Sequence, residues 1–202
     1  MSVKLTMSVN KSKPVYAPLR ADTAGRFHIL LGFAAGGGAL GRVIDELRAH
    51  APDSVGRTRV LLAGTPLAPF LDQGLAGVHG FDTTALLLAE CRCVLERSLM
   101  GSRVYIAGPE HFIGRVLQIA LAFNLNQDEV RAAAHGTLAR RVHCVHCRSV
   151  TEEVRTNIAR CSGCSRWLMV RDHYSRRFAA YMGVMVDAEA PGELPPLEEI
   201  HP

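Results

Sequence analysis

The stretch FHILLGFAAGGGALGRVIDELRAH, residues 27–50, decides the fold of the larger part of this chain. Its first seven residues, Phe27 to Phe33, form an apolar run of strand length, and Gly36-Gly37-Gly38 follow as a turn. From Leu40 to His50 the apolar residues recur with helical spacing. A buried strand, a glycine-rich turn and a helix in this order predict the first unit of a parallel α/β sheet.

The alternation of strand and helix continues to His135. Two further strands are predicted, at Thr58–Gly64 and at Arg103–Gly108. Three further helices are expected: one from Asp82 or Thr83 to Leu99, one from Gly108-Pro109-Glu110 to about Phe123, and a short one to His135 that begins at a capping box of Asn126 and Glu129. The predicted fold class is therefore α/β, a Rossmann-like parallel sheet with helices on both faces.

Composition restricts the class of protein. The chain has 202 residues, 48% hydrophobic and 21% charged, which is ordinary for a globular protein of one sizeable domain and a small one. The net charge of +4 is too small to imply nucleic acid or a membrane surface. No apolar run reaches the roughly 18 residues of a membrane span, and the first twenty residues lack the apolar segment of a secretory signal. A cytoplasmic location is expected.

Two tight cysteine pairs, Cys144-x2-Cys147 and Cys161-x2-Cys164, lie beyond the α/β pattern. Each pair presents two thiolates on one side of a short turn, and the thirteen intervening residues suffice for a strand, a turn and a return. This spacing predicts a closed tetrahedral site for Zn2+ or, alternatively, a single Fe, in a zinc-ribbon or rubredoxin-like module. Two disulfides or four buried thiols are the alternatives, and a reducing compartment disfavours the disulfides.

Other thiols and imidazoles are expected to play smaller parts. His143 and His146 flank the first pair and could replace a cysteine, but beside four thiolates they are expected to support the site or face solvent. Cys91 and Cys93 are two positions apart on a predicted helix, where side chains face different directions. They are interpreted as ordinary core or half-buried thiols.

Four regions follow from these patterns. Residues 1–25 are polar and predicted to be a flexible arm, and residues 26–137 form the α/β domain. Residues 138–186 form the four-cysteine metal-binding module, and residues 187–202 an acidic, proline-rich tail.

The α/β region resembles the NAD-binding domain of ferredoxin–NADP reductases over roughly residues 26–135. The resemblance rests on the strand Val104–Ala107 followed by Gly-Pro and a helix, and on the position of the first glycine-rich turn. It implies that NAD(P), if bound, contacts Gly36, Gly37, Gly38, Gly108 and Pro109. The glycine run is not a clean G-x-G-x-x-G, the family's cysteine is replaced by Ala107, and no flavin-binding barrel precedes the domain. A self-sufficient flavin reductase is therefore not expected.

A closer resemblance covers both parts of the chain. The strings Cys161–Cys164, Val170–Arg177, Tyr181–Val184 and Pro191–Glu193 are similar to the DmmA-type subunit of bacterial dimethylamine monooxygenase. This resemblance implies an accessory or electron-transfer subunit of a multisubunit, haem-dependent enzyme that demethylates dimethylamine with NAD(P)H and O2. Haem, flavin and a [2Fe–2S] cluster are expected on partner subunits, and no catalytic residue on this chain.

A nucleic-acid-binding zinc ribbon is the alternative function. It rests on arginines that surround the cysteines and alternate with aromatic residues: Arg140, Arg141, Arg166, Arg171, Arg176 and Arg177. The same arginines could dock on an acidic protein face, and the modest net charge and the acidic tail argue against nucleic acid. A stand-alone NAD(P)H enzyme is not supported, because the chain shows no acid–base constellation.

Overall fold

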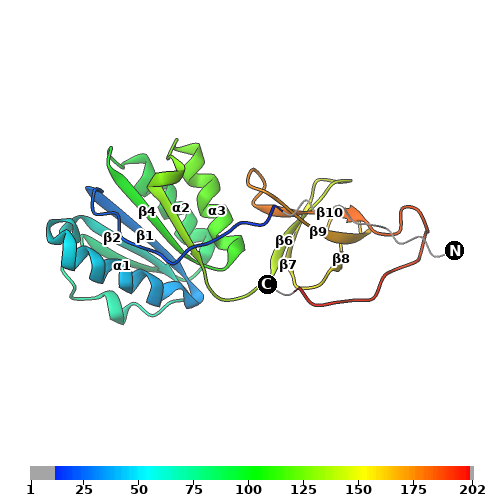
Figure 1. The fold of residues 1–202 in the computed structure, drawn as a ribbon, viewed down its shortest axis with the longest axis horizontal. Helices are drawn as coiled ribbons and strands as arrows, with labels where there is room; N and C mark the ends of the chain where they lie inside the picture. The colour runs from blue at the N-terminus through cyan, green and yellow to red at the C-terminus, as the bar shows by residue number, and fades with distance from the viewer. Residues whose placement is uncertain (1–11, 201–202) are drawn as a thin grey trace. The chain divides into compact units, whose positions relative to one another are not determined.

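The computed structural model describes residues 12–200, and these divide into two compact units. One unit comprises residues 16–139; the other comprises residues 12–15 together with residues 140–200. Figure 1 shows a sheet with helices in the first unit and a sheet with long connections in the second. Across residues 12–200 no helix combines the length and the apolar character that crossing a bilayer requires.

The first unit is built on a five-stranded parallel sheet in the order β3-β2-β1-β4-β5. Its strands are β1 (Phe27–Phe33), β2 (Thr58–Ala63), β3 (Gly77–Phe81), β4 (Ser102–Gly108) and β5 (Val130–Ala134). The chain moves outward from β1 to one edge of the sheet, and then returns to β4 on the other side of β1. The predicted α/β class with a parallel sheet is thus confirmed.

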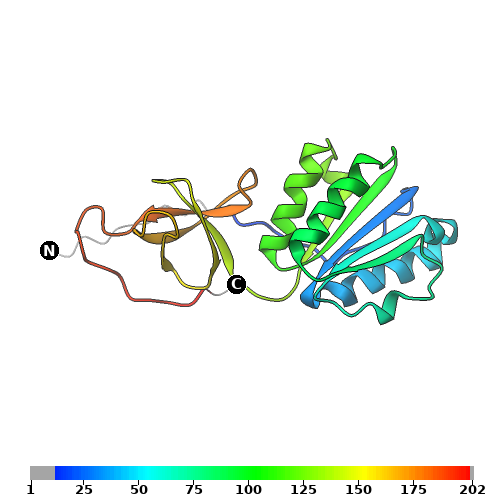
Figure 2. The same cartoon turned by 180° about the vertical axis from the view of Figure 1, so that it is seen from behind.

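Helices cover both faces of this sheet (Figure 2). They are α1 (Gly37–His50), α2 (Thr84–Glu96) and α3 (Glu110–Ala122), with short 3-10 helices at Ala34–Gly36, Pro52–Arg57, Ala68–Phe70 and Gln127–Glu129. Successive residues of a strand point to opposite faces, so Leu30 packs with α1 while Ile29 and Leu31 pack with α2 and α3. Thr83 caps α2 as predicted, its hydroxyl accepting from the Leu86 N–H at 3.2 Å.

Two expectations for this unit are wrong. The capping box of Asn126 and Glu129 is present, but it opens a single 3-10 turn, and the predicted helix to His135 is strand β5. Residues Val130–Ala134 favour a helix by local propensity, yet pairing with the exposed edge of β4 overrides it. Strand β3 was not predicted, because its sequence GVHGF holds two glycines and no apolar run.

The predicted flexible arm, residues 1–25, is packed where the structure describes it; residues 1–11 lie outside the described part. Leu19 is buried in the core beneath α1. The Asp22 N–H donates to the Tyr105 hydroxyl at 2.8 Å, and the Asp22 carboxylate lies 2.6 Å from the Arg103 guanidinium. Residues 16–25 thus make contacts within the α/β unit, while residues 12–15 belong to the other unit, and the predicted boundary at residue 25 stays a prediction.

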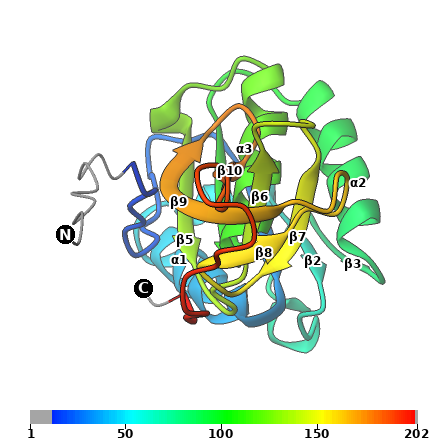
Figure 3. The ribbon, with the colours of Figure 1, turned by 90° about the vertical axis from the view of Figure 1, so that its right-hand side faces the viewer.

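The second unit is a five-stranded mixed sheet in the order β7-β6-β10-β9-β8. Its strands are β6 (Arg140–Cys144), β7 (Val150–Val154), β8 (Ile158–Arg160), β9 (Trp167–Ser175) and β10 (Ala180–Met185). Ser12 bridges to His173 on β9. The acidic tail, red in Figure 3, returns along the unit, and Glu199 bridges to Thr156 ahead of β8. Residues 201–202 of the predicted tail lie outside the described residues.

We predict that Gly36→Ala destabilises the α/β unit by about 1–3 kcal/mol. A Cβ atom on Gly36 would collide with the carbonyl of Ala107 and lie 2.9 Å from its Cβ atom, so either β4 or the turn after β1 must move. Gly41→Ala is the matched control, because a Cβ there meets nothing within 4 Å. Thermal unfolding should show a loss for the first variant and no loss for the second. Equal melting temperatures for both would contradict this packing argument.

The stability of the same unit should depend on the charge of His28. This side chain is buried, and its ring nitrogens lie 3.2 Å from the Tyr105 hydroxyl and 3.2 Å from the Gly25 carbonyl. Burial lowers the pKa of His28 below its ordinary value of 6.5. The unfolded chain therefore takes up a proton that the folded chain resists, and stability is lost as pH falls below 6.5.

Chemical denaturation between pH 7.5 and about pH 5 tests this linkage. The fall in unfolding free energy should be shallower in His28→Gln than in the wild type. Parallel curves for the two proteins would show that His28 does not contribute to the pH dependence.

Candidate metal centre

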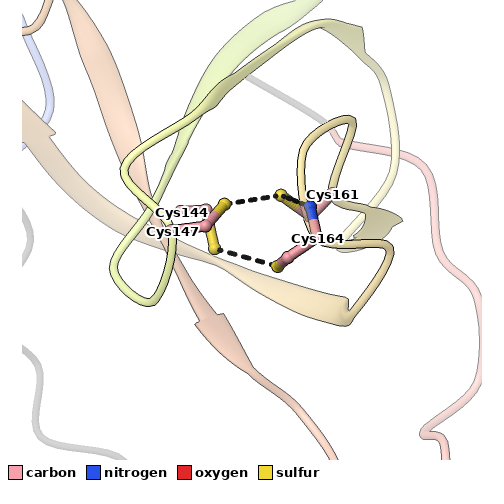
Figure 4. A group of neighbouring side chains, drawn as sticks. All are labelled: Cys144, Cys147, Cys161 and Cys164. Atoms are coloured by element: carbon pink, nitrogen blue, oxygen red, sulfur yellow. Dashed lines mark hydrogen bonds between the residues drawn. The ribbon is translucent and has the colours of Figure 1, made fainter.

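Two hairpin turns of the second unit bring the four predicted cysteines together (Figure 4). Cys144 ends β6, and Cys147 lies in the turn that leads to β7. Cys161 follows β8 directly, and Cys164 lies in the turn before β9. Antiparallel pairing of β6 with β7 and of β8 with β9 fixes both turns, so the sheet positions the four sulfur atoms.

The sulfur positions fit one tetrahedral metal ion. All four Sγ atoms lie within 4.8 Å of one another, with Cys144–Cys164 at 3.9 Å and Cys147–Cys161 at 3.5 Å. Four thiolates about 2.3 Å from one ion would be separated by roughly 3.8 Å. A disulfide needs about 2 Å, and all six cysteines of the chain are free thiols. The disulfide alternative is thus excluded by the structure.

The two turns repeat the same backbone hydrogen bonds. The N–H of Cys144 donates to the Ser149 carbonyl and the N–H of Cys161 donates to the Arg166 carbonyl, both at 2.9 Å. The residue after the second cysteine adopts a left-handed conformation in each turn, with φ of 64° at Arg148 and 57° at Ser165. Two turns of unrelated sequence therefore share one geometry, the geometry that directs both cysteines of a pair to a common point.

Backbone N–H groups point at the sulfur atoms. The N–H groups of Gly163 and Cys164 lie 3.4 and 3.5 Å from Cys161 Sγ. In the first turn, the N–H groups of Cys147 and His146 make the equivalent contacts with Cys144 Sγ. Such donors stabilise a thiolate more than a thiol, so the site is built for ionised sulfur.

The surroundings shift the pKa of three of these thiols. The Ser149 hydroxyl and backbone N–H lower the pKa of Cys147 to about 6, and the Arg166 backbone N–H, aided by its guanidinium, lowers the pKa of Cys164. Burial raises the pKa of Cys144 to about 11. An incoming cation must displace a proton from Cys144, so metal affinity should weaken as pH is lowered.

The remaining candidate ligands lie outside this cluster. The His143 ring stacks on Phe178 with centroids 4.3 Å apart, and His146 Nδ1 lies 3.1 Å from the Arg166 guanidinium. Cys91 is buried in the core of the α/β unit, where burial raises its pKa to about 12, and Cys93 is exposed. The prediction of ordinary core or half-buried thiols is right for Cys91, and Cys93 is more exposed than expected.

The five residues predicted to contact a nucleotide lie directly after the carboxyl-terminal ends of β1 and β4, or at the last residue of β4. Gly36 packs against Ala107 on β4, and a Cβ on Gly108 would lie 3.1 Å from the Phe33 carbonyl. Pro109 caps α3, and Gly37 and Gly38 open α1. Close packing of the two strand ends therefore accounts for Gly36 and Gly108 without a nucleotide. Gly38 is exposed, and a Cβ there would meet nothing within 4 Å.

The chain combines a doubly wound α/β unit with two hairpin turns that carry four cysteines. Models of one protein family match both of these parts. The model described as "Dimethylamine monooxygenase subunit DmmA-like, N-terminal domain" matches residues 8–130, and its C-terminal counterpart matches residues 141–184. The chain belongs to this dimethylamine monooxygenase subunit DmmA-like family.

Two individual proteins are similar to parts of the chain. The "Heme-dependent oxidative N-demethylase delta subunit" of Ectopseudomonas mendocina (strain ymp) is 32% identical over 111 residues, 55% of this chain and 63% of that protein. The chain thus spans less than two thirds of that relative. A solved structure described as "Ferredoxin reductase in carbazole 1,9a-dioxygenase (FAD apo form)" is similar over 59% of this chain and 34% of its own, with 17% identity and a TM-score of 0.44.

We predict that Gly163→Ala disrupts the centre although no ligand is changed. A Cβ on Gly163 would lie 2.7 Å from the Ser149 Cβ and 3.1 Å from Cys147 Sγ, so the two turns must separate. Ser162→Ala is the control, because Ser162 is an exposed neighbour in the same turn whose hydroxyl contacts Val150 and Thr151 and no cysteine. Metal content after dialysis against a chelator should fall only in Gly163→Ala. Retention of metal by that variant would contradict the close approach of the two turns.

Proposed function

We propose that this chain is an accessory or electron-transfer subunit of a multisubunit, haem-dependent oxidative N-demethylase, and that dimethylamine is the substrate of the assembled enzyme. The convergence of four sulfur atoms in a chain of this family carries the proposal. The chain itself performs no substrate chemistry in this proposal. Haem, flavin and a [2Fe–2S] cluster belong to partner subunits.

The metal site of this subunit comprises Cys144, Cys147, Cys161 and Cys164. When bound, Zn2+ would act as a structural cross-link, whereas Fe would add one-electron transfer. The half-buried Cys147 and Cys164 form the more accessible side of the cluster, and Cys144 and Cys161 form its buried side. This arrangement supports a zinc-ribbon or rubredoxin-like module over residues 138–186, with Zn2+ as the favoured ion. The proposed location of the protein is the cytoplasm.

NAD(P) binding at the α/β unit is a lesser part of the proposal. The strand order β3-β2-β1-β4-β5 places a change of direction between β1 and β4, and ligands of such sheets bind outside the strand ends at this point. Exposed Gly38 at the start of α1 offers backbone N–H groups there. A nucleotide would contact the backbone at Gly38, since Gly36 and Gly108 pack closely against the ends of neighbouring strands.

The alternative, a nucleic-acid-binding zinc ribbon, loses support from the side-chain contacts. Arg140 lies 3.0 Å from Asp172 and 4.2 Å over the Tyr181 ring. Arg141 lies 3.0 Å from Glu152. These arginines act within the module, which leaves fewer of the six for a phosphate backbone.

Reconstitution tests the proposed function. The chain is co-expressed with the genes that neighbour its own, and a tag on the chain is used for purification. We expect haem and flavin to co-purify and NAD(P)H-dependent release of formaldehyde from dimethylamine to fall at least tenfold when the chain is omitted. Full activity without the chain would contradict the proposal, and salt-sensitive binding to a mixed-sequence DNA or RNA duplex would favour the alternative.

A further inference from the structure

We propose that Arg166 is a positioning residue of the metal centre: its guanidinium ties the two hairpin turns together and balances the negative charge of the sulfur cluster. The inference rests on the proposed four-cysteine metal site and adds a residue that the cysteine spacing does not indicate. It stands on four contacts of Arg166 and on the distribution of charge around the two turns.

Arg166 touches the cluster through every polar group it has. Its carbonyl accepts from the Cys161 N–H at 2.9 Å, and its own N–H donates to Cys164. Its guanidinium also hydrogen-bonds Cys164 and lies 3.1 Å from Nδ1 of His146, which belongs to the other turn. The side chain therefore spans from one cysteine pair to the other, and it is half-buried in doing so.

The first turn has a serine at the position that Arg166 occupies in the second turn. Ser149 occupies the matching position of the first turn, and it makes the same three kinds of contact: its carbonyl accepts from Cys144, and its N–H and hydroxyl contact Cys147. The backbones of the two turns thus supply equal support. The guanidinium is the added element: Arg148 of the first turn is exposed, whereas Arg166 contacts Cys164 and reaches His146, a link that a serine hydroxyl is too short to make.

The cluster needs such a charge. Four thiolates around a divalent cation carry a formal net charge of about −2, which is costly to hold in a partly buried site. Residues 143–149 and 160–167 contain no acidic residue, so no carboxylate in either turn cancels the guanidinium. A planar donor that keeps its charge at all working pH values suits this task better than a lysine.

Three variants separate this role from general charge or folding effects. Arg166→Gln keeps a hydrogen-bond donor without the charge, and Arg166→Lys keeps the charge without the planar fork. Arg160→Gln is the matched control, because Arg160 lies in the same unit and its guanidinium stacks 5.1 Å over the Trp167 ring. Circular dichroism of each purified variant establishes that the sheet is retained.

Zinc affinity is measured by competition with a chromophoric chelator, and the midpoint potential is measured on protein reconstituted with iron. We expect Arg166→Gln to bind zinc about 10- to 100-fold more weakly, Arg166→Lys to recover part of the loss, and Arg160→Gln to match the wild type. Loss of the positive charge should also make the potential of the iron form of Arg166→Gln more negative, a change that a merely structural residue would not produce.

Wild-type affinity and potential in Arg166→Gln would overturn the inference, and so would an equal loss in Arg160→Gln. Neither result would touch the proposed function, since the wild-type chain would still bind its ion. A wild-type chain that binds neither zinc nor iron would instead overturn both the inference about Arg166 and the proposed metal site.

Discussion

The close approach of four cysteine sulfur atoms, all within 4.8 Å of one another, is the constraint on which the C-terminal unit depends, because ionising them brings four negative charges together. The sheet brings the sulfur atoms together, and backbone N–H groups from both turns offset part of their charge. The proposed cation would complete the balance, together with the guanidinium of Arg166, across a cluster of one buried pair and one half-buried pair of cysteines. Cys144 and Cys161 belong to the small hydrophobic core of this unit, so a bound ion would also hold that core together.

The α/β unit has a different source of stability. Its two faces are packed independently, α1 on one side of the parallel sheet and α2 with α3 on the other. The turn after β1 closes on β4 through Gly36, and the segment around Asp22 closes the opposite end of the sheet onto Tyr105 and Arg103. This unit has the strand order of a doubly wound α/β sheet, and Gly36 and Gly108 serve the contact between its strands.

The sequence was most informative where chemistry and spacing coincide. Cysteines separated by two residues in each of two turns predicted the cluster, because few arrangements other than a metal site use that pattern. It was less informative where a distant partner decides local structure. Val130–Ala134 became a strand because β4 offered an unpaired edge, and the packing of Leu19 beneath α1 could not be anticipated from a polar, proline-containing segment. Arg166 stood out in the sequence only as one of six arginines that could bind nucleic acid; its place beside the cysteines was not predicted, because its contact with His146 depends on how two turns face each other.

Family membership and the cysteine cluster together support the proposed role in oxidative N-demethylation, and the coordination of the proposed ion is the point on which that proposal depends. X-ray absorption spectroscopy at the zinc and iron edges of the freshly purified protein tests it most directly. The account predicts one metal per chain with four sulfur neighbours at about 2.3 Å and no nitrogen or oxygen in the inner shell. Nitrogen or oxygen ligands in place of sulfur, or no stoichiometric metal at all, would contradict it.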